Sequence, residues 1–333
     1  MRLITQRDDV LLRLGQAGRV CTPILCPNAE TPDEMEGIML GAQRYAAATG
    51  NVTCVVGIGF TATYPDHPQL EGLALERKSA AGPIKATAAT WLHWLDGYAD
   101  RLGLLDEVEV IPFMDHGWAP HEVDLELMHE AWFQAAVGII MFDASAFDFD
   151  ENIRLTAEFA RQVKHQVVVE ACPDKVYEHS ALLAKRLSEA DLLSRPEAVE
   201  RFVAQTGVDL IVPNLGTEHR SASHTPLRYR RDLAQEIARR VGPIQALHGT
   251  SSLGGRLATV GQDGICKINY YTAMARAATQ SLRQAWEASP DSVPLPIAQA
   301  CGSFLHRTRR EAVAENVYEL LRQLHGSSVS AQR

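Results

Sequence analysis

VEVIPFM at residues 108–114 decides the predicted fold, because it is an almost unbroken apolar run of strand length. Such runs are typical of parallel strands that are buried on both faces of a sheet. Seven further runs have a similar length and composition. The eight predicted strands cover residues 20–26, 52–58, 108–114, 138–143, 166–171, 208–213, 244–248 and 265–270.

Helical stretches separate most of these strands, at residues 31–49, 79–104, 121–136, 151–164, 195–206, 229–240 and 272–288. The first begins at Thr31-Pro32, a capping residue followed by a proline in the first turn. Strands and helices that alternate eight times predict a (β/α)8 TIM barrel of the α/β class. The alternative is an open doubly wound sheet, but no GxGxxG motif follows the first strand.

We expect a single domain over residues 1–333, with a C-terminal helical extension at about 289–325 and a frayed tail. The formal net charge of −9 is spread over interspersed acidic and basic residues, which excludes the basic surface of a nucleic-acid-binding protein. The longest apolar runs are shorter than the roughly 18 residues of a membrane span. The first twenty residues lack the apolar centre of a signal peptide, so we expect a cytoplasmic protein.

Three predicted strands lead into a histidine: His116 in IPFMDHG, His219 in LIVPNLGTEHR and His248 in IQALHGT. In a parallel barrel the carboxyl ends of all strands lie on one face, and that face carries the catalytic site. A catalytic zinc site takes three protein ligands and leaves a fourth position open. The pattern therefore predicts one zinc ion held by these histidines, although such a site also accepts Co²⁺, Ni²⁺ or Fe²⁺.

Acidic residues also stand at strand ends. Asp115 directly precedes His116, and because successive strand residues point to opposite sides, both can face the site only where the strand ends and the chain turns. There Asp115 could move a proton next to the metal, or it could cap a turn or orient a histidine. Asp143 and Glu170 could orient metal ligands or hold the metal in a second position. Asp143 also suits a turn cap.

Two connections are unusually long, at residues 59–78 and 172–194. Both would emerge at the catalytic face, where long loops often serve as lids or substrate contacts. The segment Gly249-Thr250-Ser251-Ser252 and Asn269 follow the seventh and eighth strands. Loops at these positions of a barrel often bind phosphate through backbone N–H groups and hydroxyls.

Together these segments resemble the class II, zinc-dependent ketose-bisphosphate aldolases, which include the fructose- and tagatose-1,6-bisphosphate enzymes. The resemblance covers most of the chain from about residue 20 onward, in the same order. It is carried by FMDHG at 113–117, MFDASAFDFDENIRLT at 141–156, VVVEA at 167–171, RPEAVERFVAQTGVDLIVPNLGTEHR at 195–220, ALHGTSS at 246–252, GICKINYYTA at 264–273 and the C-terminal TRREAVAENVYELLRQLHGSS.

The resemblance implies a (β/α)8 barrel in which His116, His219 and His248 hold the zinc ion. It casts Asp115 as the acid/base that exchanges a proton with the C4 hydroxyl of the substrate. Glu170 and Glu178 join Asp115 in the expected catalytic set. The expected substrate-binding set is Asn28, Asp143, Gly216, Arg220, Gly249, Thr250, Ser251, Asn269 and Thr272, of which Gly216, Ser251 and Asn269 correspond to positions that hold dihydroxyacetone phosphate.

The chain departs from the family pattern where the family holds a phosphate. Arg220 replaces a glycine, HGTSS at residues 248–252 replaces HGGSG, and Tyr270-Tyr271 replaces a small or acidic pair. The loop after the fifth strand lacks the usual Gly-Gly-acid pattern, for which Glu178 is only a rough substitute. We therefore expect a donor other than plain dihydroxyacetone phosphate, such as a carboxylated one bound by Arg220. Alternatively, Arg220 points to solvent or to a partner subunit.

The leading hypothesis is a zinc-dependent aldolase that reversibly cleaves a sugar phosphate or related hydroxy-carbonyl compound other than plain fructose-1,6-bisphosphate. The same site could instead run an isomerisation, hydration or hydrolysis, because function resides in the site and not in the fold. A metal-binding pseudo-enzyme is the third reading. The resemblance further implies a homodimer or homotetramer, and we expect a small-molecule carbonyl substrate as the binding partner.

Overall fold

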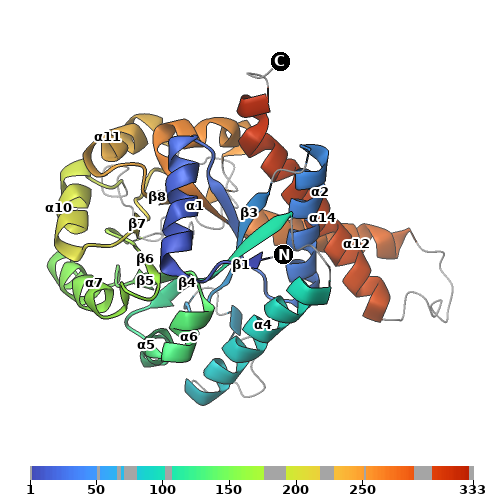
Figure 1. The fold of residues 1–333 in the computed structure, drawn as a ribbon, viewed down its shortest axis with the longest axis horizontal. Coiled ribbons are helices and arrows are strands. Elements are labelled where there is room, and N and C mark those ends of the chain that lie inside the picture. Colours follow the sequence, from blue (N-terminus) through green and yellow to red (C-terminus); the bar gives the residue numbers. More distant parts are fainter. Residues whose placement is uncertain are drawn as a thin grey trace.

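The structure is a computed structural model that describes residues 2–50, 53–65, 69–70, 81–101, 107–175, 193–217, 229–250, 253–288 and 302–329. Eight parallel strands follow one another around a closed barrel (Figure 1). They are β2 (Ile24–Pro27), β3 (Cys54–Phe60), β4 (Val108–Trp118), β5 (Ile139–Asp143), β6 (Val168–Ala171), β7 (Leu210–Ile211), β8 (Gln245–Leu247) and β9 (Ile265–Tyr270). The barrel closes where β9 pairs with β2 and β4 with β5. The predicted (β/α)8 TIM barrel is confirmed.

Helices alternate with the strands and surround them. They are α2 (Pro32–Ala48), α4 (Ala81–Arg101), α5 (Glu122–His129), α6 (Ala131–Ala136), α7 (Phe149–Val163), α10 (Pro196–Thr206), α11 (Arg231–Val241) and α12 (Thr272–Glu287), with a 3₁₀ segment, η2 (Gly254–Asp263), before β9. The prediction of a single helix at 121–136 is wrong, because the segment forms two helices, α5 and α6. They are separated by Glu130, whose backbone is extended. The Gln134 side chain donates to the Met128 carbonyl at this break (2.8 Å) and satisfies one acceptor at the end of α5.

The N-terminal segment forms two elements that the strand pattern did not predict. Strand β1 (Arg2–Leu3) pairs with the first half of β4, and helix α1 (Arg7–Arg19) follows it. Val10 and Leu14 of α1 share a buried cluster with residues from the amino ends of the strands, such as Ile139. Helix α1 therefore covers the amino-terminal end of the barrel, and in Figure 1 it crosses in front of the strands. The opposite end remains for the site.

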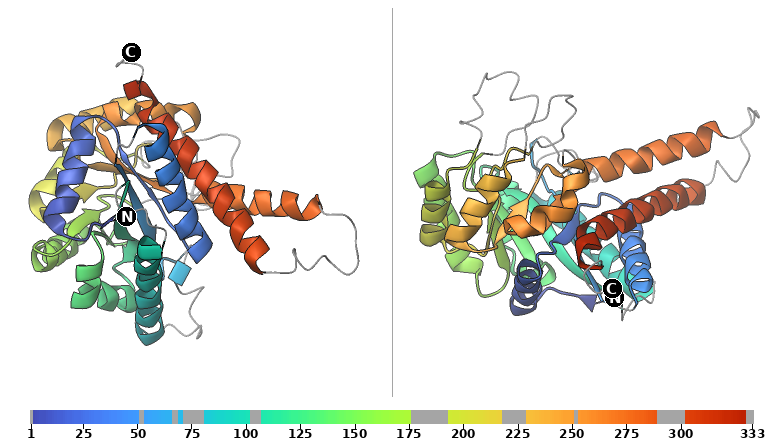
Figure 2. Two further views of the ribbon diagram at one scale, coloured as in Figure 1. Left: turned by 45° about the vertical axis from the view of Figure 1, so that its right-hand side comes forward. Right: turned by 90° about the horizontal axis from the view of Figure 1, so that it is seen from above.

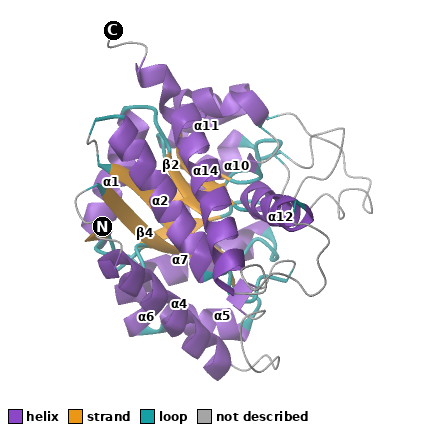
Figure 3. Ribbon diagram, turned by 90° about the vertical axis from the view of Figure 1, so that its right-hand side faces the viewer, coloured by secondary structure: helices purple, strands orange, loops and turns teal. Residues whose placement is uncertain are grey.

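The last helix, α14 (Gly302–Val329), packs along α2. The two axes come close because α2 presents Gly37 and Gly41 to Val313 and Val317 of α14. Figure 3 shows both helices over the strands, and Figure 2 shows α12 and the start of α14 projecting beyond the barrel. In the described part of the chain, no helix combines the length and the apolar character that a membrane span needs.

Candidate metal and catalytic site

Asp115 and His116 face the site by a route that differs from the one expected. Strand β4 does not end at residue 114 but continues to Trp118. Its pairing with β5 shifts register between Met114 and Gly117, and His116 adopts a positive φ of 45°. This irregularity breaks the alternation of side chains, so neighbouring residues can both turn inward. Asp115 is 7% exposed and His116 is 2% exposed.

Two amide side chains hold the Asp115 carboxylate. Asn28, directly after β2, donates to Oδ2 (2.9 Å), and Asn269 of β9 donates to Oδ1 (2.8 Å). Around the barrel, β3, β2 and β9 follow on one side of β4, and β5 pairs with its other side. These donors therefore come from strands on the side of β4 away from β5. Each carboxylate oxygen thus accepts one fixed hydrogen bond, which sets the direction of the group.

The imidazole of His116 is oriented by Asp143 at the end of β5. Nδ1 lies 2.7 Å from Oδ2 of Asp143, whose Oδ1 accepts from the Ser145 backbone N–H (3.0 Å). Burial would raise the pKa of Asp143, but these hydrogen bonds hold it below its usual value. Burial would lower the pKa of His116, but Asp115 and Asp143 raise it. A carboxylate on one ring nitrogen is the usual support of a metal-binding histidine.

His248 follows β8 and lies beside His116, with ring centroids 5.0 Å apart. Burial lowers its pKa well below the usual value, so the imidazole is neutral at pH 7. Neutral imidazole is the form that binds metal. Ligand atoms of Asp115, His116 and His248 all lie within 4.8 Å of one another. The two imidazoles could share a divalent cation such as zinc, with the Asp115 carboxylate beside it.

Glu170 is fully buried in β6, and its charge is compensated by a residue that the sequence analysis missed. Lys267 of β9 is also fully buried, and its Nζ lies 2.8 Å from Glu170 Oε2. It also donates to Asn269 Oδ1 and lies 4.6 Å from the centre of the Phe113 ring. The only sequence signal was a lysine within the apolar run ICKINY, two positions from Asn269 and hence on the same strand face.

Tyr64 and Cys172 also adjoin the site and were not predicted. The Tyr64 ring stacks on His116, with centroids 4.4 Å apart. Cys172 offers a sulfur atom within 4.8 Å of ligand atoms of His116 and Asp143. Burial and the surrounding carboxylates raise the pKa of this thiol well above its usual value. Neither residue stands in a pattern that sequence alone associates with a metal.

The other predicted residues are less closely tied to this cluster. Gly249 and Gly216 adopt positive φ values of 64° and 79°, and Thr272 begins α12. The Thr250 hydroxyl donates to the Asn269 carbonyl (2.8 Å), so its proton is already used within the protein. Four predicted residues lie outside the described part of the chain: Glu178, His219, Arg220 and Ser251.

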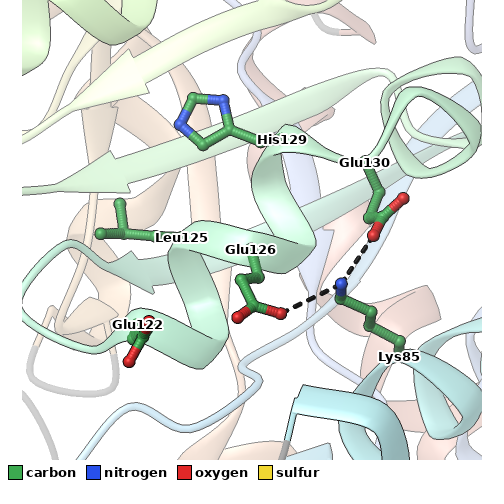
Figure 4. Close-up of a pocket in the computed structure, with 6 residues that line it drawn as sticks. All are labelled: Lys85, Glu122, Leu125, Glu126, His129 and Glu130. Atoms are coloured by element: carbon green, nitrogen blue, oxygen red, sulfur yellow. Dashed lines mark hydrogen bonds and ion pairs between the residues drawn. The ribbon is translucent and has the colours of Figure 1, made fainter.

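A hollow of about 430 Å³ on the outer surface lies away from this site (Figure 4). It is lined by residues of α4, α5 and the break after α5. Lys85 bridges Glu126 (3.1 Å) and Glu130 (2.6 Å) within it. Partly exposed pairs of this kind are ordinary surface features, and none of the described site residues named above lines this hollow.

Comparisons with known proteins identify the family of the chain. The sequence profile of the family described as fructose-bisphosphate aldolase class-II matches residues 77–328. YdjI of Escherichia coli is 28% identical over 228 residues, which cover 68% of this chain and 74% of YdjI. The crystal structure titled YdjI aldolase superposes with a TM-score of 0.67 at 22% identity, over the full length of both chains.

Two named enzymes are similar over shorter stretches. The fructose-bisphosphate aldolase of Treponema pallidum is 27% identical over 227 residues, which cover 56% of this chain and 65% of that enzyme. The 6-phospho-5-dehydro-2-deoxy-D-gluconate aldolase of Bacillus licheniformis is 28% identical over 218 residues, which cover 62% of this chain and 71% of that enzyme.

Proposed function

Because the chain belongs to the class II fructose-bisphosphate aldolase family, we propose that it is a zinc-dependent lyase for a hydroxy-carbonyl substrate. In the proposed reaction one carbon–carbon bond is reversibly cleaved. The observation that carries the proposal is the convergence of Asp115, His116 and His248 at the carboxyl end of the barrel. This set combines a proton-transfer group with metal ligands, as aldol chemistry requires.

The proposed zinc ligands are His116, His248 and His219. The described part of the chain supports the first two. The Asp143 carboxylate occupies Nδ1 of His116, so Nε2 is the nitrogen that would be available to a metal. A zinc ion held by these residues would supply Lewis-acid chemistry at the donor carbonyl.

Asp115 is the proposed acid/base. In cleavage it takes the proton of the hydroxyl on the carbon that becomes the aldehyde, and in condensation it returns that proton. Asn28 Oδ1 is buried and has no hydrogen-bond partner among the described residues, so it is suited to accept a hydrogen bond from a substrate hydroxyl. Glu170, Glu178 and the remaining substrate-binding positions keep the roles proposed from the sequence.

We further propose that the substrate is a sugar phosphate or related compound other than plain fructose-1,6-bisphosphate. The two named aldolases differ in the sugar phosphate for which each is named, so family membership leaves the substrate open. Thr250 fills a family glycine position, and its hydroxyl bonds to the Asn269 carbonyl. Arg220 remains the proposed anion-binding group. A homodimer or homotetramer remains the proposed assembly.

The test is carbon–carbon cleavage by the purified protein. Fructose-1,6-bisphosphate, tagatose-1,6-bisphosphate and 6-phospho-5-dehydro-2-deoxy-D-gluconate are offered in turn, and the carbonyl products are identified by mass spectrometry. We expect cleavage of at least one sugar phosphate that is lost with a chelator and restored by zinc. Products that keep all carbons together would favour an isomerase or hydratase. A kcat/KM for fructose-1,6-bisphosphate of about 10⁴ M⁻¹s⁻¹ or more would contradict the proposed substrate change.

A further inference from the structure

The imidazole of His116 has two supports: Asp143 bonds to its ring nitrogen, and Tyr64 stacks on its face. Tyr64, four residues after the end of β3, is 7% exposed and stacks on the imidazole at an interplanar angle of 27°. The ring of Trp118 packs against Tyr64 in a T-shaped contact, with centroids 5.3 Å apart and an interplanar angle of 89°. Asp143 fixes the in-plane direction of the imidazole, and Tyr64 restricts its tilt.

His116 needs such support because of its backbone. Its φ of 45° lies in the left-handed region, which is unfavourable for a residue with a Cβ atom. The irregular pairing of β4 with β5 at this point also removes ladder hydrogen bonds that would otherwise hold the strand. A metal ligand on such a backbone depends on neighbouring side chains to stay in a fixed position.

The segment that carries Tyr64 is itself anchored to α5. The Thr63 hydroxyl donates to Asp124 Oδ1 (2.5 Å) and therefore accepts from Nδ1 of His121. The second oxygen of Asp124 accepts from the backbone N–H of Trp118 (2.8 Å). The fully buried Asp124 therefore connects the segment after β3 with the end of β4. Its partner Thr63 is next to Tyr64, and its partner Trp118 is two residues after His116.

We propose that Tyr64, anchored through Thr63 and Asp124, is a positioning residue for the metal ligand His116. The stacked Tyr64 ring holds the imidazole in one orientation, so that a metal can bind without a change in the backbone of β4 at the register shift. This inference rests on the proposed zinc site, and it assigns to Tyr64 no contact with the reacting atoms. Loss of the stack leaves the ligand present but mobile, which weakens metal binding and speeds metal release.

The test measures zinc affinity by competition with a chromophoric chelator, together with melting of the metal-free protein. Tyr64→Leu fills the space but cannot stack on the imidazole. We expect it to bind zinc about 10-fold or more weakly, within the range seen when supports of metal ligands are removed. Tyr64→Phe keeps the ring and should bind zinc like the unaltered protein. Thr63→Val removes the anchor and should weaken zinc binding in the same direction.

Two controls separate this inference from others. Glu122→Gln changes an exposed residue of α5 beside the hollow in Figure 4 and should leave zinc affinity unchanged. His116→Ala should lose zinc, and if it does not, the proposed metal site fails before Tyr64 is considered. If His116→Ala loses zinc while Tyr64→Leu and Thr63→Val bind it as tightly as the unaltered protein, the positioning role is refuted.

Discussion

Replacement of Lys267 by methionine tests the account of the barrel interior. The two side chains of the Lys267–Glu170 pair are fully buried and lie 2.8 Å apart. Methionine keeps most of the volume but leaves the Glu170 charge without its partner. Breaking a buried ion pair by removing one member costs about 3–5 kcal/mol. With an unfolding entropy of about 2.1 cal/mol/K per residue, a chain of 333 residues loses about 4–7 °C in Tm.

Calorimetry of the metal-free protein measures this shift. The double variant Lys267→Met/Glu170→Gln removes both charges and should recover most of the lost stability, because neutral groups tolerate burial better than an unpaired carboxylate. Lys85→Met breaks the partly exposed pairs of the surface hollow and should leave Tm almost unchanged. A Tm for Lys267→Met within about 1 °C of the unaltered protein would refute the claim that the contact between Lys267 and Glu170 stabilises the fold.

Three further predictions follow from individual contacts. Asp115→Asn should keep zinc while turnover of any cleaved substrate falls by about 10²–10⁴, and unchanged turnover would remove Asp115 from the mechanism. Burial raises the pKa of Asp124 from 3.8 to about 6. The protonated Asp124 carboxyl stabilises the unaltered protein, and this stabilisation is lost as pH rises from about 4 to 6. Asparagine does not titrate, so the Tm of Asp124→Asn relative to the unaltered protein should increase over that range and then level off. A difference in Tm that does not change with pH would contradict the raised pKa. Gly41→Ala places a Cβ 2.6 Å from the Ala314 carbonyl oxygen and should lower Tm, whereas Gly97→Ala meets open space and should not.

The barrel was predictable because its strands are short apolar runs in regular alternation with helices, a pattern that depends only on local composition. The site was predictable in outline for a related reason. Once the strands are parallel, residues that follow them share one face, which brings Asp115, His116 and His248 together. The β4 irregularity was not predictable, because a register shift depends on the neighbouring strand and leaves the apolar run unchanged.

The supports of the site were missed because they arise from contacts between distant segments. In the sequence, Lys267 is a charged residue within an apolar strand. Only the structure shows that it pairs with Glu170 of another strand inside the barrel. Tyr64 and Asp124 lie in a loop and a helix whose own patterns carry no metal signal. Their roles appear only when the segment after β3 meets the end of β4.

X-ray absorption at the zinc K-edge tests the central claim, that histidines at the mouth of the barrel hold a catalytic zinc ion. The zinc-loaded protein should show a first shell of nitrogen and oxygen at about 2.0–2.1 Å, with multiple scattering from imidazole rings. His248→Ala should lose that signal. A sulfur shell at about 2.3 Å would instead place the metal on Cys172 with His116 and Asp143, and it would contradict the account.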